Sequence, residues 1–269
     1  MSFKISQLLE YSFVHIIAQH RSGSTALHSY VQSKWPGKSR NQHREQTGIG
    51  FWHEVDQRMR YSLSEPFNQY TNYYPATRKK PGFLAWQQAQ VQALCYDIKQ
   101  HTQNYVCMKN LIEDIIKFDD ETQNLLYNLP GITVGLYRED TFDQTCSECV
   151  LEIMMDAFPN QRSSKIHPDQ YTSLDKKEFV HKLEENIKQK QLMHSLKHRF
   201  DVMIAYEHIE NQFPKALEWQ RNPPKSHTII NYNKVVQWYN EYMASAGLTK
   251  KVTHKGINFI IDKTLQHKA

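Results

Sequence analysis

The segment FVHIIAQHRSGSTALHSYV, residues 13–31, decides how the rest of the chain is interpreted. Its start is apolar and rich in β-branched residues, which predicts a strand over Phe13–Gln19. A glycine between small hydroxyl residues follows, and apolar residues at helical spacing then predict a helix over Ala26–Ser33. A strand, a tight loop and a helix start in this order present backbone N–H groups and a helix N-terminus to an anion.

Short strands and helices alternate along the remaining sequence. We expect strands over Tyr105–Met108, Ile132–Tyr137 and Phe200–Tyr206. Apolar periodicity predicts helices over Phe83–Lys99, Leu111–Leu129, Phe142–Phe158, Lys176–Lys197 and Asn231–Ala246. This alternation predicts an α/β fold in which a mainly parallel sheet is flanked by helices, within a single domain over residues 1–269.

Residues 34–82 interrupt the alternation. They are polar and rich in aromatic residues, with turn signals in WPGK, TGIG and YYPATRKKPG. We predict an irregular excursion of loops and short helices, and long stretches of this kind are usually functional or disordered. Its aromatic residues either line a cleft or hold the excursion to the core; they are Trp35, Phe51, Trp52, Tyr61, Tyr70, Tyr73 and Tyr74.

Composition narrows the class of protein. No stretch approaches the roughly 20 apolar residues that a membrane-spanning helix needs, and the start MSFKISQLLEYSFVHII is too polar for a signal peptide. We therefore expect a soluble, cytoplasmic protein. A net charge of +5 is dispersed along the chain, which disfavours a nucleic-acid-binding face. We expect the four cysteines to be core or helix-face residues, because CSEC is a lone C-x-x-C without further zinc ligands nearby.

The loop after the first predicted strand has the chemistry of an anion site. Gly23 permits a positive φ, the hydroxyls of Ser24 and Thr25 can cap or donate, and Arg21 adds a planar, charged donor fork. A Walker A loop would need G-x-x-x-x-G-K-[ST], and this segment lacks the first glycine and the lysine, which disfavours an ordinary nucleotide kinase. No cysteine lies in the loop, which disfavours a cysteine phosphatase. Taken alone, the loop also fits an ordinary capped helix start.

A second constellation lies in GITVGLYREDTFDQTCSECV. Arg138 ends a predicted strand, and Ser147 follows nine residues later on the next predicted helix, where both can reach one phosphate. The order strand–RSGST–helix and then strand–R-E-D-x-x-x-Q-x-x-S–helix resembles the sulfotransferases that use PAPS (3′-phosphoadenosine 5′-phosphosulfate).

Two further segments extend the resemblance over most of the chain. The segment at residues 206–209, YEHI, is similar to the strand-ending Y-E-D-L of that family, with His208 in place of the acid. IINYNKVVQWY is similar to the N-[WY]-x-x-[VL] helix start of bacterial-type members. The first loop carries Arg21 where the cytosolic branch has lysine, although arginine is common there in the Golgi and bacterial branches.

The resemblance implies a P-loop-like, three-layer nucleotide-binding fold with PAPS as co-substrate and no metal. The sulfuryl group would move to a hydroxyl or amine of a carbohydrate, lipid or small-metabolite acceptor, with the 34–82 excursion on the acceptor side. Arg138 and Ser147 would hold the 3′-phosphate. The 5′-phosphosulfate would be held by Arg21, Ser22, Gly23, Ser24, Thr25 and Ala26, and Arg21 would also stabilise charge on the leaving oxygen.

A hydroxyl acceptor also needs a base. In related bacterial enzymes a glutamate shortly after the first helix has this role, and Glu45 is in a comparable place. His43, His53 and Glu54 compete with Glu45 for it. Lys109, at the end of YVCMK, either faces the crevice or is solvated. Glu207 is expected to orient a loop or cap a backbone group rather than take part in the chemistry.

Two other classes of function remain open. One is a non-catalytic relative that keeps the nucleotide or anion site without turnover. The other is a nucleotide kinase-like phosphotransferase, which the missing Walker lysine disfavours.

Overall fold

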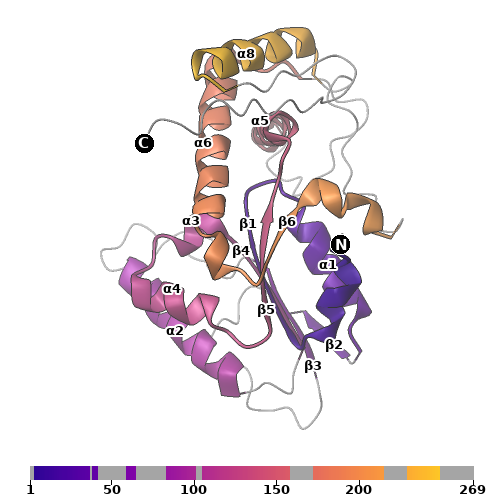
Figure 1. The fold of residues 1–269 in the computed structure, drawn as a ribbon, viewed down its shortest axis with the longest axis vertical. Coiled ribbons are helices and arrows are strands. Elements are labelled where there is room, and N and C mark those ends of the chain that lie inside the picture. The colour runs from indigo at the N-terminus through magenta and orange to yellow at the C-terminus, as the bar shows by residue number, and fades with distance from the viewer. Residues whose placement is uncertain are drawn as a thin grey trace. The chain divides into compact units, whose positions relative to one another are not determined.

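The computed structural model describes residues 3–36, 38–41, 59–64, 83–100, 105–157, 172–214 and 229–248 (Figure 1). The chain divides into two compact units. Unit 1 comprises Met1–Glu139 and Gln189–Glu218, and unit 2 comprises Asp140–Lys188 and Trp219–Ala269. Compactness alone does not separate a subdomain from a domain, so the single domain expected from the sequence stays a prediction.

The sheet of unit 1 has six strands among the described residues, in the order β2-β3-β4-β1-β5-β6. All five pairings between neighbouring strands are parallel. The strands are β1 (Phe13–Ala18), β2 (Lys38–Asn41), β3 (Met59–Ser64), β4 (Tyr105–Leu111), β5 (Ile132–Tyr137) and β6 (Val202–Ala205).

Helices cover both faces of this sheet. One face carries the 3-10 helix η1 (Ile5–Glu10) and α1 (Ser24–Lys34), and the other carries α2 (Phe83–Gln100), α3 (Ile112–Ile115) and α4 (Asp120–Tyr127). Strand β1 serves both layers, because successive side chains point to opposite faces. Its Val14 and Ile16 pack in the cluster of α1, whereas Ile17 packs in the cluster of α2 and α4. The predicted α/β fold with a parallel sheet between helices is confirmed at this level.

The path of the chain marks one place in the sheet. After β1 the chain runs to β2 at one edge, and after β5 it runs to β6 at the other. The neighbouring strands β1 and β5 therefore send the chain in opposite directions. In open parallel sheets the ligand crevice lies outside the carboxyl ends of the strands at such a switch point. A ligand site is therefore expected at the loops that follow β1 and β5.

Unit 2 is built from helices α5 (Thr141–Ala157), α6 (Lys176–Ser195) and α8 (Tyr232–Ser245), and α6 continues into unit 1 from Gln189. Its core centres on Phe142, whose ring lies 5.2 Å from that of Tyr239 and 6.2 Å from that of Phe179. The remaining short helices belong to unit 1: η2 (Lys197–Arg199), η3 (Tyr206–His208) and η4 (Glu210–Gln212).

Two strands correct the prediction for residues 34–82. We expected loops and short helices there, but residues 38–41 and 59–64 are strands of the sheet. The alternation of apolar and polar residues in MRYSLS is the period of a strand, so this signal was present in the sequence. KSRN has no such pattern, and its pairing with β3 decides its structure. Residues 42–58 and 65–82 lie outside the described residues.

Most other predicted elements are found, with changes at their ends. Strand β5 has the predicted bounds, α1 begins two residues early at Ser24, and β4 continues to Leu111. The helix predicted over Leu111–Leu129 is interrupted between α3 and α4, where Asp119 caps α4 by accepting a hydrogen bond from Thr122 N–H.

The four cysteines are free and buried, as expected of core residues. Burial raises the pKa of Cys95 and Cys149 to about 12 and also raises that of Cys107, so the thiolate is disfavoured at these positions. Among the described helices, none is long and apolar enough to cross a membrane.

Candidate functional site

The loop that follows β1 has an unusual backbone. Arg21 has φ 55°, a conformation that is uncommon for a residue with a side chain, and Gly23 has φ 76°. Ser22 is fully buried, and its hydroxyl donates to the carbonyl oxygen of Gln19 at 2.8 Å. Strain of this kind costs about 1–3 kcal/mol and clusters at ligand-binding sites. The loop is held in a shape that a free chain would not favour.

Helix α1 starts directly from this loop. Its N-cap is Gly23, whose lack of a side chain leaves the first turn without a side-chain cap. Of the two roles predicted for the hydroxyls of Ser24 and Thr25, capping is wrong, because both residues already lie inside the helix, and donation to a ligand stays a prediction. The backbone N–H groups of a first turn and the helix dipole favour an anion at this position.

Lys109 brings a positive charge to the same helix start. It lies near the end of β4 with 3% of its surface exposed, and its Nζ donates to Thr25 Oγ1 at 3.0 Å. Of the two positions that the sequence left open, the solvated one is therefore wrong. A buried ammonium beside a helix N-terminus strengthens the attraction for an anion, since the local dielectric constant is lower than that of water.

The loops after β1 and β5 are joined by one side chain. Gln19 is fully buried, and its backbone N–H donates to the carbonyl oxygen of Leu136 at 3.1 Å. Its side-chain Oε1 accepts a hydrogen bond from the backbone N–H of Arg138, also at 3.1 Å. Gln19 thereby fixes the start of the second loop against the first. Sequence reasoning missed this residue, although a polar residue that ends an apolar strand is a visible signal.

The side chain of Arg138 is held by helix η3. Its guanidinium lies 5.1 Å from the centre of the Tyr206 ring, and its Nε lies 3.7 Å from Glu207 Oε1. The other carboxylate oxygen, Oε2, accepts a hydrogen bond from the backbone N–H of Glu139 at 3.1 Å. Glu207 thus orients the loop after β5, in agreement with its predicted role.

Tyr206 also contacts the first loop. A Cβ atom added to Gly23 would lie 2.1 Å from Cε2 of the Tyr206 ring. The glycine is required for this close approach as well as for its positive φ. The ends of β1, β5 and β6 therefore meet at Gly23, Arg138 and Tyr206.

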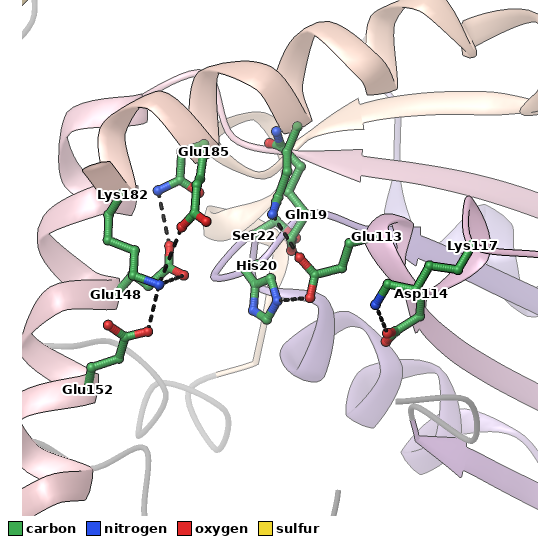
Figure 2. A network of polar contacts seen from close by, with 12 residues as sticks. Gln19, His20, Ser22, Glu113, Asp114, Lys117, Glu148, Glu152, Lys182 and Glu185 are labelled. Carbon is green, nitrogen blue, oxygen red and sulfur yellow. Dashed lines mark hydrogen bonds and ion pairs between the residues drawn. The ribbon is translucent and has the colours of Figure 1, made fainter. Parts of the chain in front are cut away.

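A histidine and a carboxylate lie beside the loop, pointing toward each other (Figure 2). His20 Nε2 is 2.8 Å from Glu113 Oε1, and both side chains are partly exposed. The amide of Gln189 donates to Glu113 Oε2 at 3.0 Å. On the next residue of α6, Lys190 Nζ donates to the carbonyl oxygen of Glu139 at 2.8 Å. This end of α6 thus contacts both α3 and the loop after β5.

The structure brings part of the predicted site together. Arg138 and the loop Arg21–Ala26 belong to unit 1, at the ends of adjacent strands. Ser147 is buried on α5 in unit 2, so its predicted role on the 3′-phosphate stays a prediction. The predicted base Glu45 and its competitors His43, His53 and Glu54 lie outside the described residues.

Of the aromatic side chains predicted to matter in residues 34–82, the structure describes only that of Trp35. Trp35 is buried, and its ring lies 5.2 Å from that of Tyr105 in β4, so it holds the chain to the core. The side chain of Tyr61 in β3 is outside the description, as are Phe51, Trp52, Tyr70, Tyr73 and Tyr74.

A second charged cluster lies in unit 2, on α5 and α6 (Figure 2). Lys182 Nζ is 2.9 Å from Glu152, 3.4 Å from Glu185 and 3.8 Å from Glu148. Burial acts to lower the pKa of Lys182, but the hydrogen bond to Glu152 and the charges of the three carboxylates outweigh it and raise the pKa. Over the described parts of both units, no group of three or more His, Cys, Asp or Glu side chains could hold a metal ion.

No model of a known protein family matches the chain, and no curated protein matches it in sequence. The chemistry of the site must therefore be argued from its own residues. Hydrogen-bond donors and positive charge gather at the carboxyl ends of the inner strands β1, β4 and β5. They come from the strained loop, the start of the eleven-residue helix α1, Lys109 and Arg138. Such an arrangement can bind phosphate or sulfate groups and stabilise negative charge that develops on them.

Proposed function

We propose that the protein is a PAPS-dependent sulfotransferase with a P-loop-like nucleotide site. It moves the sulfuryl group of PAPS to a hydroxyl or amine of a carbohydrate, lipid or small-metabolite acceptor. The observation that carries the proposal is the loop between β1 and α1, in which Arg21 and Gly23 both have positive φ and Lys109 contacts Thr25. The resemblance of RSGST and of the later Arg138 segment to that family selects PAPS among the anions that such a loop can bind.

The proposed chemistry follows from where charge develops. An acceptor oxygen attacks the sulfur in line, as in phosphoryl transfer, and negative charge builds on the bridging oxygen and the 5′-phosphate. Arg21, Lys109 and the backbone N–H groups from Ser22 to Ala26 stabilise that charge. These donors belong to a fixed loop and a helix start, so little reorganisation is needed during the reaction.

The 3′-phosphate distinguishes PAPS from ATP and ADP. Arg138 is the residue of unit 1 assigned to it, because its position is set by Gln19, Tyr206 and Glu207 beside the first loop. An arginine suits this role, since its planar fork donates two hydrogen bonds to one phosphate. Ser147 is the second residue assigned to this phosphate, and Glu45 is the base that the resemblance implies.

Calorimetric titration with PAP, the product nucleotide, tests the proposal. AMP is the matched ligand, since it lacks only the 3′-phosphate, and ADP controls for a second phosphate at the 5′ end. A charge-assisted contact contributes about 1.5–3 kcal/mol, so PAP is expected to bind roughly 10- to 150-fold more tightly than AMP. Equal affinities for PAP and AMP would remove the 3′-phosphate site. A preference for ADP would instead favour the kinase-like alternative.

Turnover separates the enzyme from a non-catalytic relative. PAP is expected to accumulate when the protein is incubated with PAPS and a panel of sugar, aryl and amine acceptors. Selective PAP binding without release of PAP from PAPS in any of these mixtures would favour the non-catalytic alternative.

A further inference from the structure

The pair His20 and Glu113 stands out among the titratable groups of unit 1. His20 connects the last residues of β1 to Arg21, so its ring is carried by the same loop that forms the anion site. Its side chain is 32% exposed. Two other histidines of unit 1, on β1 and α1, are buried. His15 is fully buried against Asn110, and His28 contacts the carbonyl oxygen of Cys107 at 3.1 Å. Of these three, His20 is the one that solvent or a substrate can reach.

Glu113 is fixed from two sides. It lies on α3 directly after β4, where one carboxylate oxygen is 2.8 Å from His20 Nε2. The other oxygen accepts a hydrogen bond at 3.0 Å from Gln189, which comes from α6. An ionised carboxylate only accepts hydrogen bonds, so Nε2 of a neutral His20 must carry the proton. That tautomer leaves Nδ1 as the basic nitrogen, in the arrangement by which a carboxylate orients a catalytic histidine.

We infer that His20, oriented by Glu113, accepts the proton of the attacking acceptor during sulfuryl transfer. This inference rests on the proposed function and deepens it, because it assigns the base of the same site to His20 in place of Glu45, which lies outside the described residues. The cations of the site, Arg21, Lys109 and Arg138, cannot serve, since a charged arginine or lysine has no lone pair to accept a proton. A neutral imidazole, in contrast, keeps one ring nitrogen with a lone pair that can accept a proton.

The step balances as follows. The acceptor oxygen forms a bond to sulfur while the bond between sulfur and the bridging oxygen breaks, and that electron pair leaves with the 5′-phosphate of PAP. The acceptor proton moves to Nδ1 of His20. The resulting imidazolium is stabilised by the Glu113 carboxylate and afterwards returns its proton to solvent.

Charged groups from the neighbouring elements bear on the titration of His20. Glu113 on α3 contacts the ring, Arg21 is its neighbour in the chain, and Lys190 is on the turn of α6 that carries Gln189. Asp114, also on α3, pairs with Lys117 at 3.2 Å.

The test uses PAPS with water as the acceptor, so that no acceptor need be identified. Release of PAP is measured against pH for the wild type, His20→Asn and Glu113→Gln, and PAP affinity is measured for each. We expect His20→Asn to lower the rate about 10²- to 10⁴-fold, to keep PAP affinity within about twofold, and to abolish the fall in rate on acidification. Glu113→Gln should give a smaller loss and a shifted acid limb.

Unit 2 offers a matched control. His181 and Glu185 also form a histidine–glutamate pair, at 3.5 Å, on an exposed surface of α6. His181→Asn should change neither the rate nor its pH dependence. An unchanged rate in His20→Asn would overturn the inference, as would a loss of PAP affinity that matches the loss of rate.

A spectroscopic measurement decides the matter even where water is a poor acceptor. In protein labelled with ¹⁵N-histidine, the neutral ring of His20 should be the Nε2–H tautomer, and Glu113→Gln should change that tautomer. An Nδ1–H ring in the wild type would overturn the inference. The two proposals fail separately: equal binding of PAP and AMP sinks the sulfotransferase, whereas selective PAP binding with an active His20→Asn variant sinks only the role of His20.

Discussion

Lys109 of unit 1 is buried and Lys182 of unit 2 is partly buried, and the surroundings of the two lysines differ. Lys109 donates to the hydroxyl of Thr25 at the start of α1, beside a loop with two positive φ angles. Lys182 lies within 4 Å of three carboxylates from α5 and α6. The first lysine adds positive charge to a helix N-terminus, whereas the second has its charge surrounded by opposite charge.

The difference separates a binding arrangement from a stabilising one. A lysine enclosed by carboxylates is satisfied inside the protein, and its replacement should act mainly on stability. A lysine beside a helix N-terminus increases a field that attracts an anion, so its replacement should act mainly on binding. Of these two lysines, Lys109 of unit 1 is therefore the one whose charge can attract an anion.

The largest expected difference between the units is in acid. His15 in β1 of unit 1 is fully buried, and burial lowers its pKa to about 3. An unfolded histidine titrates near 6.5, so the unfolded state binds more protons between these two values. Stability is therefore full above pH ~6.5 and falls as the pH drops toward 3, by up to about 5 kcal/mol.

Urea unfolding at a series of pH values measures this loss, and hydrogen exchange assigns it to a unit. Segments of unit 1 should lose protection from hydrogen exchange first on acidification, because unit 1 contains the buried His15. His181 of unit 2 is exposed and can be protonated without unfolding. His15→Asn should flatten the dependence by about one proton. A variant as acid-sensitive as the wild type would show that other groups control the acid limb.

The next largest effect is expected from two glycines with similar φ. Gly23 has φ 76° and Gly247 of unit 2 has φ 67°, but a Cβ on Gly23 would overlap the Tyr206 ring, whereas one on Gly247 meets open space. Gly247→Ala should cost about 1–2 kcal/mol from the left-handed backbone alone. Gly23→Ala should cost roughly 2–5 kcal/mol, since overpacking is added. Thermal unfolding of both variants measures the difference, and equal losses would mean that Tyr206 moves aside easily.

The local features of this site could be predicted from the sequence. The apolar runs of β1 and β5 were found from their composition, and the positive φ of Gly23 was anticipated from the loop that it ends. The position of Arg138 followed from the end of a predicted strand. These features depend on residues near one another in the chain, where periodicity and turn chemistry act.

The contacts that assemble the site could not be predicted from local sequence patterns, because they join residues that are far apart in the chain. Lys109 and Thr25 are 84 residues apart, and Gln19 and Arg138 are 119 apart. Which distant strands become neighbours depends on the order of the sheet, and periodicity does not carry that order. The strand β3 was overlooked for a different reason, because its six alternating residues were outweighed by turn signals on both sides.

The next comparison is between two arginines of unit 1, Arg138 and Arg199, each of which lies over a tyrosine ring. Removing its charge in Arg138→Ala should weaken PAP binding by about 10- to 150-fold and leave AMP binding nearly unchanged, since the lost contact is to the 3′-phosphate. Arg199 is the matched control, because its guanidinium also lies over a tyrosine ring, at 5.5 Å from that of Tyr127. Calorimetry should find PAP affinity unaltered in Arg199→Ala. Equal losses for PAP and AMP in Arg138→Ala would place this arginine elsewhere on the nucleotide.

The smallest expected effect belongs to Lys182. In Lys182→Met the carboxylates of Glu148, Glu152 and Glu185 repel one another without a cation, which should cost about 1 kcal/mol at neutral pH because the cluster is partly solvated. The cost should shrink in salt, which screens the repulsion. PAP affinity should stay within about twofold, whereas Lys109→Met should lower it at least about tenfold. Equal losses of PAP affinity in the two lysine variants would contradict the distinction between the two charged regions, because the charge of Lys182 is already balanced by its three carboxylates.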